Sequence, residues 1–303
     1  MAKRLSHTDT ARTSRFYAPW EPYAYLALPL AALMLVFGWP FVGSLGMSLL
    51  NFDQNLYAPT WAGFGNLIAL LSNTGFQQAL WQSGLYLVGI VPPLVLLPVA
   101  VAMLVNGNFR GVSTFRILLY LPVVVSMVAV GIAWKWLLQE DGLLNYLLSI
   151  AFGWAGFKPL PWLVWPKLAM LSIMAVVIWK GIGYYMMIYL SHLQHLSADL
   201  DEAAALDGAN LWQRFWQVTL PQLKPAMALV ALVSTIGALK LFTEIYVMTR
   251  GGPAGTTQSA VYAVYELAFE RLQLGQACAA GLLLSALLVT LSGGQWLMGR
   301  SKS

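Results

Sequence analysis

The sequence predicts an all-α integral membrane protein with six transmembrane helices. Of its 303 residues, 59% are hydrophobic and only 10% are charged, whereas a soluble domain carries about 25% charged residues. Long apolar stretches recur along the chain, and a helix needs about 20 mostly apolar residues to cross a bilayer. The net charge of +5 does not indicate a nucleic-acid binder, because basic loops are expected in a membrane protein.

The first three spans follow a polar, basic tail over residues 1–22. Residues 23–50 contain no charged side chain and predict the first span, residues 79–105 the second and residues 115–138 the third. Proline disturbs the hydrogen bonding of a helix, so the prolines of the first two spans predict kinks or irregular turns. They are Pro29, Pro40, Pro92, Pro93 and Pro98.

The last three spans are predicted over residues 168–190, 226–248 and 274–298. The segment before them, residues 140–166, is rich in Trp and Pro. Trp residues concentrate at the membrane–water interface. We therefore expect this segment to be a loop at the outer membrane surface.

The distribution of basic residues predicts the orientation. With six spans both termini lie on one side, and that side holds ten Lys and Arg residues against four on the other. The positive-inside rule then places both termini and the loop over residues 192–225 in the cytoplasm. The ten are Lys3, Arg4, Arg12, Arg15, Arg110, Arg116, Arg214, Lys224, Arg300 and Lys302, and the four are Lys158, Lys167, Arg250 and Arg271.

Residues 202–225 are the one long polar and aromatic interruption of the apolar chain. Acidic residues at Asp199, Asp201 and Glu202 favour the start of a helix, where the dipole is positive. Ser197 is the expected N-cap, and Gly208 stands where a left-handed residue would end the helix.

A second short helix is predicted from Asn210. Its period places Leu211, Phe215 and Val218 on one stripe, and Trp212 and Trp216 on an adjoining one. Pro221 is expected to end this helix, and Pro225 suits the first turn of the next span. Together the two helices predict a compact helix-turn-helix loop between two spans.

The same residues carry a resemblance to a family. Glu202-Ala203-Ala204, Asp207-Gly208-Ala209, Phe215 and Thr219-Leu220-Pro221 resemble the EAA loop of binding-protein-dependent ABC importer permeases. The resemblance implies the type I ABC importer permease fold, with residues 23–303 as the transmembrane permease domain. It also implies that the loop is a coupling helix docked on a cytoplasmic ATPase, through Glu202, Ala203, Ala204, Asp207, Gly208, Phe215 and Pro221. The alternative is an ordinary amphipathic cytoplasmic loop.

Further residues resemble the carbohydrate branch of this family, which includes maltose, lactose and glycerol-3-phosphate permeases. They are Trp179-Lys180-Gly181, Thr249-Arg250-Gly251-Gly252-Pro253, Phe269 and Gly275-Gln276-Ala277. The resemblance runs from about residue 80 to residue 297. It implies that the chain translocates a sugar or sugar-like solute.

The resemblance also implies the partners and the location. The partners are a second homologous permease subunit, two cytoplasmic ATPase subunits and a periplasmic or lipid-anchored solute-binding protein, in the inner membrane of a bacterium or archaeon. No G-x-x-x-x-G-K-[ST], H-E-x-x-H or G-x-S-x-G motif occurs in the sequence. We therefore expect no enzyme activity and no cofactor on this chain, with ATP and Mg²⁺ bound by the partner ATPase.

Ionisable residues within the predicted spans are candidates for function, because a charge in hydrocarbon is unfavourable. Lys240 and Glu244 are four residues apart, so a continuous fifth helix would bring them together as an ion pair. The pair would line the solute pathway or be a structural pair buried against the partner subunit. Lys180 lies in mid-span, and its expected partner is Glu244 or a carboxylate of the second permease.

The resemblance implies that positions of the fourth and fifth spans line the solute cavity. Tyr184 suits a sugar, since its ring can stack on the apolar face of the sugar and its hydroxyl can donate a hydrogen bond; the alternative is an ordinary packed aromatic residue. Ala238 and Leu241 replace polar residues of some relatives. The candidate positions are Lys180, Gly181, Tyr184, Ser234, Ala238 and Leu241.

Three other interpretations fit the sequence less well. His192 and His195 are three residues apart, but a pair of His residues at the end of a helix fits a solvated dipole contact better than a metal site. An ion-driven secondary transporter would use Lys240 and Glu244 as a relay, yet it leaves the 202–225 loop unexplained. An ABC permease for an amino acid, a peptide or phosphate keeps the fold and changes the solute.

Overall fold

The computed structural model describes residues 20–52, 58–107, 109–195 and 198–300. These residues form helices and one antiparallel ribbon, in which β1 Leu50–Asn51 pairs with β2 Thr60–Trp61. Five helices are long and apolar enough to cross a bilayer, or six if one sharply bent pair counts as a span. This confirms the all-α membrane fold. The basic tail up to residue 19 and the proposed cap Ser197 lie outside the described residues.

The chain divides into two units, residues 1–46 and 47–303. The first contains α1 Glu21–Leu33, the π-helical segment Met34–Gly38 and the greater part of α2 Trp39–Ser48. These elements follow one another without a break and supply the candidate span Tyr23–Ser48. The π-helical turn comes just before Pro40, whose missing N–H cannot serve the carbonyl four residues back. The irregularity that the sequence predicts at Pro40 is therefore a π-helical turn.

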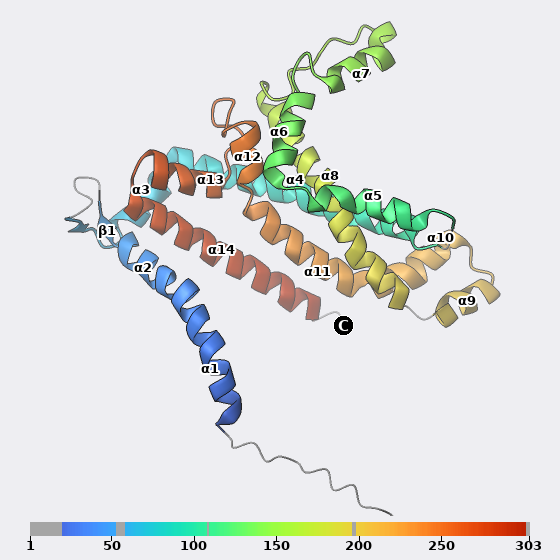
Figure 1. Cartoon of the computed structure of the whole chain (residues 1–303), viewed down its shortest axis with the longest axis horizontal. Coiled ribbons are helices and arrows are strands. Elements are labelled where there is room, and N and C mark those ends of the chain that lie inside the picture. The colour runs from blue at the N-terminus through green and yellow to red at the C-terminus, as the bar shows by residue number, and fades with distance from the viewer. Residues whose placement is uncertain (1–19, 53–57, 108, 196–197, 301–303) are drawn as a thin grey trace, which may run out of the picture. The chain divides into compact units, whose positions relative to one another are not determined.

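The second unit is built on α4 Thr74–Val105, α8 Pro166–His195 and α11 Leu220–Leu239, which pack against one another. Two further helices flank them: α5 Val112–Val124 packs on α8, and α14 Leu274–Arg300 packs on α11 (Figure 1). Fully buried side chains such as Tyr86, Ile173 and Met186 fill the space between the central helices. In a bilayer such packing, and not escape from water, is the main force between helices.

Helix α4 stays continuous although it contains Pro92, Pro93 and Pro98. The predicted irregularity of this span is therefore not observed as a break. A neighbouring helix supports this stretch, because the hydroxyl of Tyr189 on α8 donates a hydrogen bond of 2.9 Å to the carbonyl of Val95. Such neighbours make proline tolerable in a membrane helix.

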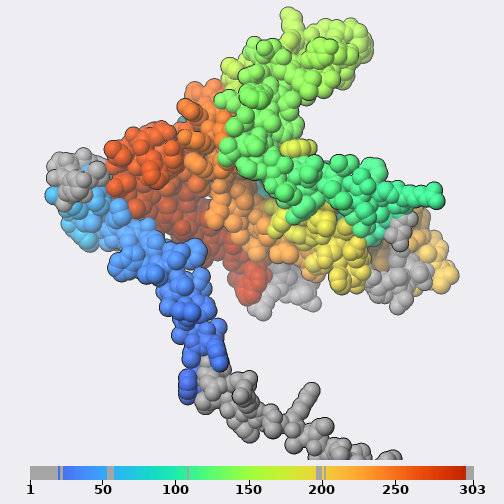
Figure 2. Space-filling view, in the orientation of Figure 1, coloured from blue at the N-terminus to red at the C-terminus, as the bar shows by residue number. Residues whose placement is uncertain are grey.

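The third predicted span is not one continuous helix. Residues 115–138 are divided between α5 and α6 Met127–Leu137, and the two helices meet at an angle of 97°. The break occurs because Val125 has an extended backbone, with ψ 137°, and so ends the helix. Beyond α6, the helix α7 Leu143–Phe152 and the 3₁₀ turn Gly153–Ala155 continue an arm that projects from the central helices (Figures 1 and 2).

The fifth span is shifted towards the N-terminus relative to the prediction of 226–248. One helical segment runs from Leu211 to Leu239 through α10 Leu211–Arg214, the π-helical segment Phe215–Thr219 and α11. Pro221 does not end it: the π-helical segment Phe215–Thr219 directly precedes Pro221 and accommodates its missing N–H, as the segment Met34–Gly38 does before Pro40. The helix ends instead at Leu239, and α12 Thr243–Met248 begins after a short break.

The connecting elements lie at two opposite ends of the second unit (Figure 1). One end carries β1, α3 Gly65–Ser72, α13 Ala260–Tyr265 and the π-helical segment Glu266–Glu270. The other end carries α9 Ala198–Leu206 and α10. Helices α3 and α13 at one end and the predicted coupling loop at the other are thus separated by the length of the spans.

The contact between α5 and α8 depends on Gly183. A Cβ atom at this position would lie 2.1 Å from the carbonyl oxygen of Leu119 and 3.1 Å from the Cα of Tyr120. No larger residue fits without separating the helices, since the obstacle is backbone. Small residues allow such close approach in membrane helix pairs.

We predict that Gly183→Ala destabilises the protein by about 1–3 kcal/mol, as expected for overpacking. The measurement is the apparent melting temperature of the purified protein in nanodiscs, followed by tryptophan fluorescence. Gly84→Ala on α4 is the matched control, because a Cβ there meets no atom within 4 Å. Equal melting temperatures for the two variants would contradict the close contact.

Candidate functional site

A cavity of about 260 Å³ lies between α4, α8, α11 and the two helix breaks. Seven of the eight residues predicted for the pathway line it, and Lys240 does not. The structure therefore gathers positions that are up to 64 residues apart in sequence, from Lys180 to Glu244, around one space. The lining residues are Ile90, Leu94, Val123, Met127, Val177, Lys180, Gly181, Tyr184, Tyr185, Ser234, Gly237, Ala238, Leu241 and Glu244.

Helix α8 supplies the aromatic wall of the cavity. Tyr184 is 41% exposed, and its ring meets that of Tyr185 edge-on, with the centroids 5.1 Å apart. Tyr185 is buried and so supports the ring of Tyr184 from behind. Gly181 brings α4 close, because a Cβ there would lie 2.9 Å from Cδ2 of Leu94. The result is one accessible phenol on a rigid support.

Helix α11 supplies a mostly apolar wall. Ala238 and Leu241 are buried, and the hydroxyl of Ser234 donates hydrogen bonds to the carbonyls of Val230 and Ala231 in its own helix, at 2.6 and 3.2 Å. The other polar side chains that line the cavity are Lys180, Tyr184, Tyr185 and Glu244. A site with one aromatic face and few polar groups can bind and orient a small polar solute.

The charged residues do not pair as predicted. Helix α11 ends before Lys240 and α12 starts at Thr243, so Lys240 and Glu244 are not one turn apart on a common helix. Arg271 forms an ion pair of 2.7 Å with Glu266, and Lys240 is exposed. Lys180 instead donates to the backbone carbonyls of Pro122, Val123 and Val125.

Sequence reasoning missed seven lining residues. Val177, Tyr185 and Gly237 lie on α8 and α11, which already supply predicted positions. The other four are Ile90 and Leu94 on α4, and Val123 and Met127 beside the break between α5 and α6. Nothing in their spacing distinguishes them from lipid-facing or core residues. Their place in the cavity results from the packing of α4 and from the bend of 97°, neither of which the local sequence predicts.

The break between α11 and α12 is held by hydrogen bonds that residues 257–260 make with Leu241 and with α4. The hydroxyl of Ser259 donates a hydrogen bond to the carbonyl of Leu241, and the hydroxyl of Ser83 on α4 accepts one of 2.8 Å from the amide of Ala260. Tyr86 donates to the carbonyl of Thr257 at 3.0 Å. The segment after Gly252 is therefore tied to α4 and to the cavity wall.

The predicted coupling loop is closed by local hydrogen bonds. The amide of Gly208 donates to the carbonyl of Ala205, and the amide of Ala209 donates to that of Ala204, which is the Schellman pattern of a helix end. Gly208 has φ +82°, as this motif requires. Asn210 and Gln213 then form a reciprocal capping box at 2.9 Å that starts α10. Gly208 thus ends the first helix, as predicted.

Large apolar side chains are exposed on this loop. Leu206 is 89% exposed, Leu211 79% and Trp212 69%. The rings of Trp212, Phe215 and Trp216 form one cluster, with centroids 5.3 to 6.2 Å apart, and Phe215 packs against the core. An exposed apolar patch on a rigid support indicates an interaction surface.

The two neighbouring histidines do not converge on a common point through their Nδ1 atoms. His192 Nδ1 lies 3.3 Å from the carbonyl of Ile188, and His195 Nδ1 lies 2.6 Å from that of Ser191. Each ring is therefore engaged by its own helix. This favours the interpretation of the two histidines as contacts at the negative end of the helix dipole, and not as ligands of a shared metal.

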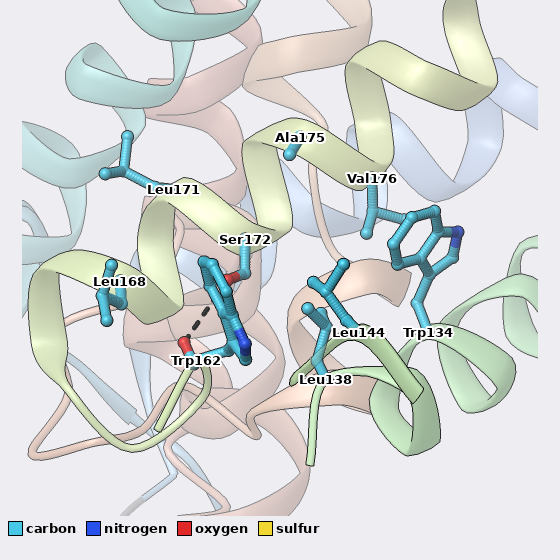
Figure 3. A pocket seen from close by; sticks show the side chains of 9 residues that line it. All are labelled: Trp134, Leu138, Leu144, Trp162, Leu168, Leu171, Ser172, Ala175 and Val176. Atoms are coloured by element: carbon cyan, nitrogen blue, oxygen red, sulfur yellow. Dashed lines mark hydrogen bonds between the residues drawn. The ribbon is translucent and has the colours of Figure 1, made fainter. Parts of the chain in front are cut away.

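A second cavity, of about 230 Å³, lies between α6, α7 and α8 (Figure 3). Its walls are apolar except for Ser172, whose hydroxyl bonds the carbonyl of Trp162 at 3.3 Å. Trp162 is fixed in turn by Asn145, which accepts from its indole N–H at 2.9 Å. This cavity is lined mainly by apolar side chains and by none of the predicted pathway residues, so it is not the candidate site.

The family model described as "Binding-protein-dependent transport system inner membrane component" matches residues 64–297. The chain is 33% identical over 268 residues to a lactose transport system permease protein of Rhizobium radiobacter, covering 88% of each chain. It is 31% identical over 270 residues to a trehalose/maltose transport system permease protein of Thermococcus litoralis, covering 88% of this chain and 89% of that one.

Two solved structures share the fold. One is a bacterial ABC transporter involved in the import of the acidic polysaccharide alginate, with a TM-score of 0.79, 24% identity and coverage of 93% of this chain and 96% of that one. The other is a bacterial alginate ABC transporter in complex with an alginate pentasaccharide-bound periplasmic protein. Its TM-score is 0.77, with 25% identity and coverage of 93% and 94%.

We predict that the cavity is open to water and not to lipid. In a Cys278→Ala background, Tyr184→Cys should react with a membrane-impermeant thiol reagent, because this position is exposed within the cavity. Met186→Cys on the same helix is the control and should stay unlabelled, since Met186 is fully buried. An unreactive Tyr184→Cys would show that water does not reach this wall.

Proposed function

This chain belongs to the family of binding-protein-dependent transport system inner membrane components, and from that premise we propose that it is the subunit through which an ATP-driven importer moves a carbohydrate. It is a multi-pass membrane permease. The transport step needs energy that this chain does not supply. We assign ATP hydrolysis, with its ATP and Mg²⁺, to a partner ATPase.

The observation that carries the proposal is the rigid loop of α9 and α10 with its exposed apolar patch. Leu206, Leu211 and Trp212 are presented on helices whose ends are fixed by their own hydrogen bonds. Such a patch fits the cleft of a cytoplasmic ATPase subunit, and the importer would hold two of them. Glu202 lies on α9, where a carboxylate would pair with a basic residue of the ATPase; its side chain lies outside the described part of the structure.

The cavity supports a carbohydrate as the solute. Tyr184 offers an aromatic face for a sugar ring, and Glu244 offers hydrogen-bond acceptors for its hydroxyl groups. The named solutes of the relatives are lactose, trehalose and maltose. Because Ala238 and Leu241 are apolar, this chain would provide only part of the polar contacts. A second, homologous permease subunit would provide the rest.

The elements that lie away from the α9–α10 loop support a solute-binding protein as the third kind of partner. One of the solved relatives was crystallised with a periplasmic protein that carries its solute. In this chain the segments around α3, α7 and α13 would meet a periplasmic or lipid-anchored binding protein. The excess of basic residues on the other side supports cytoplasmic termini, in the inner membrane of a bacterium or archaeon.

In the proposed transport cycle the spanning helices move as rigid bodies. Closure of the ATPase dimer on ATP would move the α9–α10 loop as one body, since its turns are closed by hydrogen bonds. Helices α8 and α11 join this loop to the cavity. Their rocking would open the cavity alternately to the two sides of the membrane.

We predict that Trp212→Ala lowers the amount of ATPase subunit that co-purifies with the tagged chain from its native membranes at least fivefold, because hot-spot aromatics often contribute about 2 kcal/mol or more to an interface. The measurement is a pull-down in mild detergent with quantitative mass spectrometry. Trp154→Ala is the matched control, since Trp154 is also exposed but lies beyond α7, away from the loop.

Retention of the ATPase by Trp212→Ala, at the level of Trp154→Ala, would contradict the docking surface. Recovery of the wild-type chain alone, with no nucleotide-binding partner and no second permease, would reject the importer assembly as a whole.

We also predict that Tyr184→Ala raises the half-saturating solute concentration for uptake about three- to tenfold, which corresponds to the loss of one aromatic contact. Uptake of labelled lactose, maltose and trehalose would be measured with the complete assembly in proteoliposomes. Tyr184→Phe keeps the ring and should change uptake less. Unchanged uptake in both variants would place the solute elsewhere.

A further inference from the structure

The break between α5 and α6 leaves backbone groups that the helices themselves cannot satisfy. The last carbonyls of any helix have no partner within it. Here Val125 is extended and Ser126 makes no side-chain cap for α6. Inside a membrane such groups need a donor from elsewhere in the protein.

Lys180 of α8 supplies that donor. Its Nζ lies 3.1 Å from the carbonyl oxygen of Pro122, 3.2 Å from that of Val123 and 3.0 Å from that of Val125. An ammonium group has three protons and therefore three hydrogen bonds to give. All three are directed to the break, at the negative end of the α5 dipole.

The position of Lys180 along α5 is fixed by the next turn of α8. Gly183 is three residues further and faces the same helix, because a Cβ there would overlap the carbonyl of Leu119. The backbones of α5 and α8 are therefore in direct contact beside the break. Sliding of one helix past the other would move the ammonium away from its three acceptors.

We propose that Lys180 is a positioning residue that sets the angle between α5 and α6. Val123 and Met127 flank the break and line the cavity, so the angle between α5 and α6 determines the position of this cavity wall. In this conformation the ammonium acts on the backbone and not on the solute. The part of the proposal that concerns transport rests on the proposed function, whereas the part that concerns the angle does not.

The test measures the angle directly. Spin labels at Ile117→Cys on α5 and Trp136→Cys on α6, both exposed positions, are introduced in the Cys278→Ala background. Their separation is measured by double electron–electron resonance in the complete assembly, in nanodiscs, without solute or nucleotide. Wild type should give one narrow distance distribution, and Lys180→Met should give a broadened or shifted one.

Two further variants test whether the hydrogen bonds of Lys180, and not the loss of any lysine from α8, are responsible for the change. Lys180→Arg keeps a permanent charge and several N–H donors, so it should restore the narrow distribution. Lys167→Met removes a lysine from an exposed position of the same helix and should behave as wild type. If Lys180→Met does not insert, Lys180→Gln, which keeps two donors, replaces it and should give a distribution between wild type and a free hinge.

Uptake kinetics provide a second readout. Loss of the three hydrogen bonds of Lys180 should lower the maximal rate at least fivefold, and any change in the half-saturating solute concentration should accompany a change in the distance distribution. An unchanged distance distribution in Lys180→Met, or in Lys180→Gln where it replaces Lys180→Met, would overturn the proposal. So would a raised half-saturating concentration at an unchanged distance, because that would make Lys180 a ligand of the solute. The distance result holds whatever the chain transports, so its failure differs from a failure of the proposed function.

Discussion

A bilayer contains no water to hydrogen bond a peptide group, so every interruption of a spanning helix must be closed by the protein itself. Two interruptions show how this chain does so. Lys180 donates to the carbonyls at the end of α5, and Ser259 donates to the carbonyl of Leu241 after α11. Where the span α4 itself ends, Arg116 donates to the carbonyl of Val105 through Nε and Nη2. In each case a side chain from another element completes the backbone, so the breaks also hold the helices together.

The candidate site lies where two of these breaks meet. Val123 and Met127 come from the break between α5 and α6, and Leu241 and Glu244 come from the break between α11 and α12. Irregular backbone at membrane depth is tolerated only where it is buried or lines a cavity. The closure of the breaks and the formation of the cavity are therefore consequences of the same packing, and an altered break would alter the site.

The cavity and the exposed loop are far apart but mechanically connected. Helix α8 carries Tyr184 in its middle and ends next to the loop, and the helical segment from Leu211 to Leu239 begins in the loop and carries Ser234 beside the cavity. The loop itself is stabilised by bonds among its own residues, such as the capping box of Asn210 and Gln213. A partner that moves the loop would thus move two walls of the site together.

The sequence by itself determined the membrane class, the approximate places of the spans and the construction of the loop. Apolar length and the Gly208 and Asn210 patterns act over a few residues, and the pathway candidates followed from a family resemblance. The tertiary structure alone decided the rest: that residues 115–138 bend by 97°, that Pro221 lies within a helix, and that Lys240 stands apart from Glu244. It also decided that Lys180 bonds carbonyls 55 to 58 residues away. The physical reason is that a helix break is stable only when distant side chains satisfy it, and the local sequence does not encode which side chains those are.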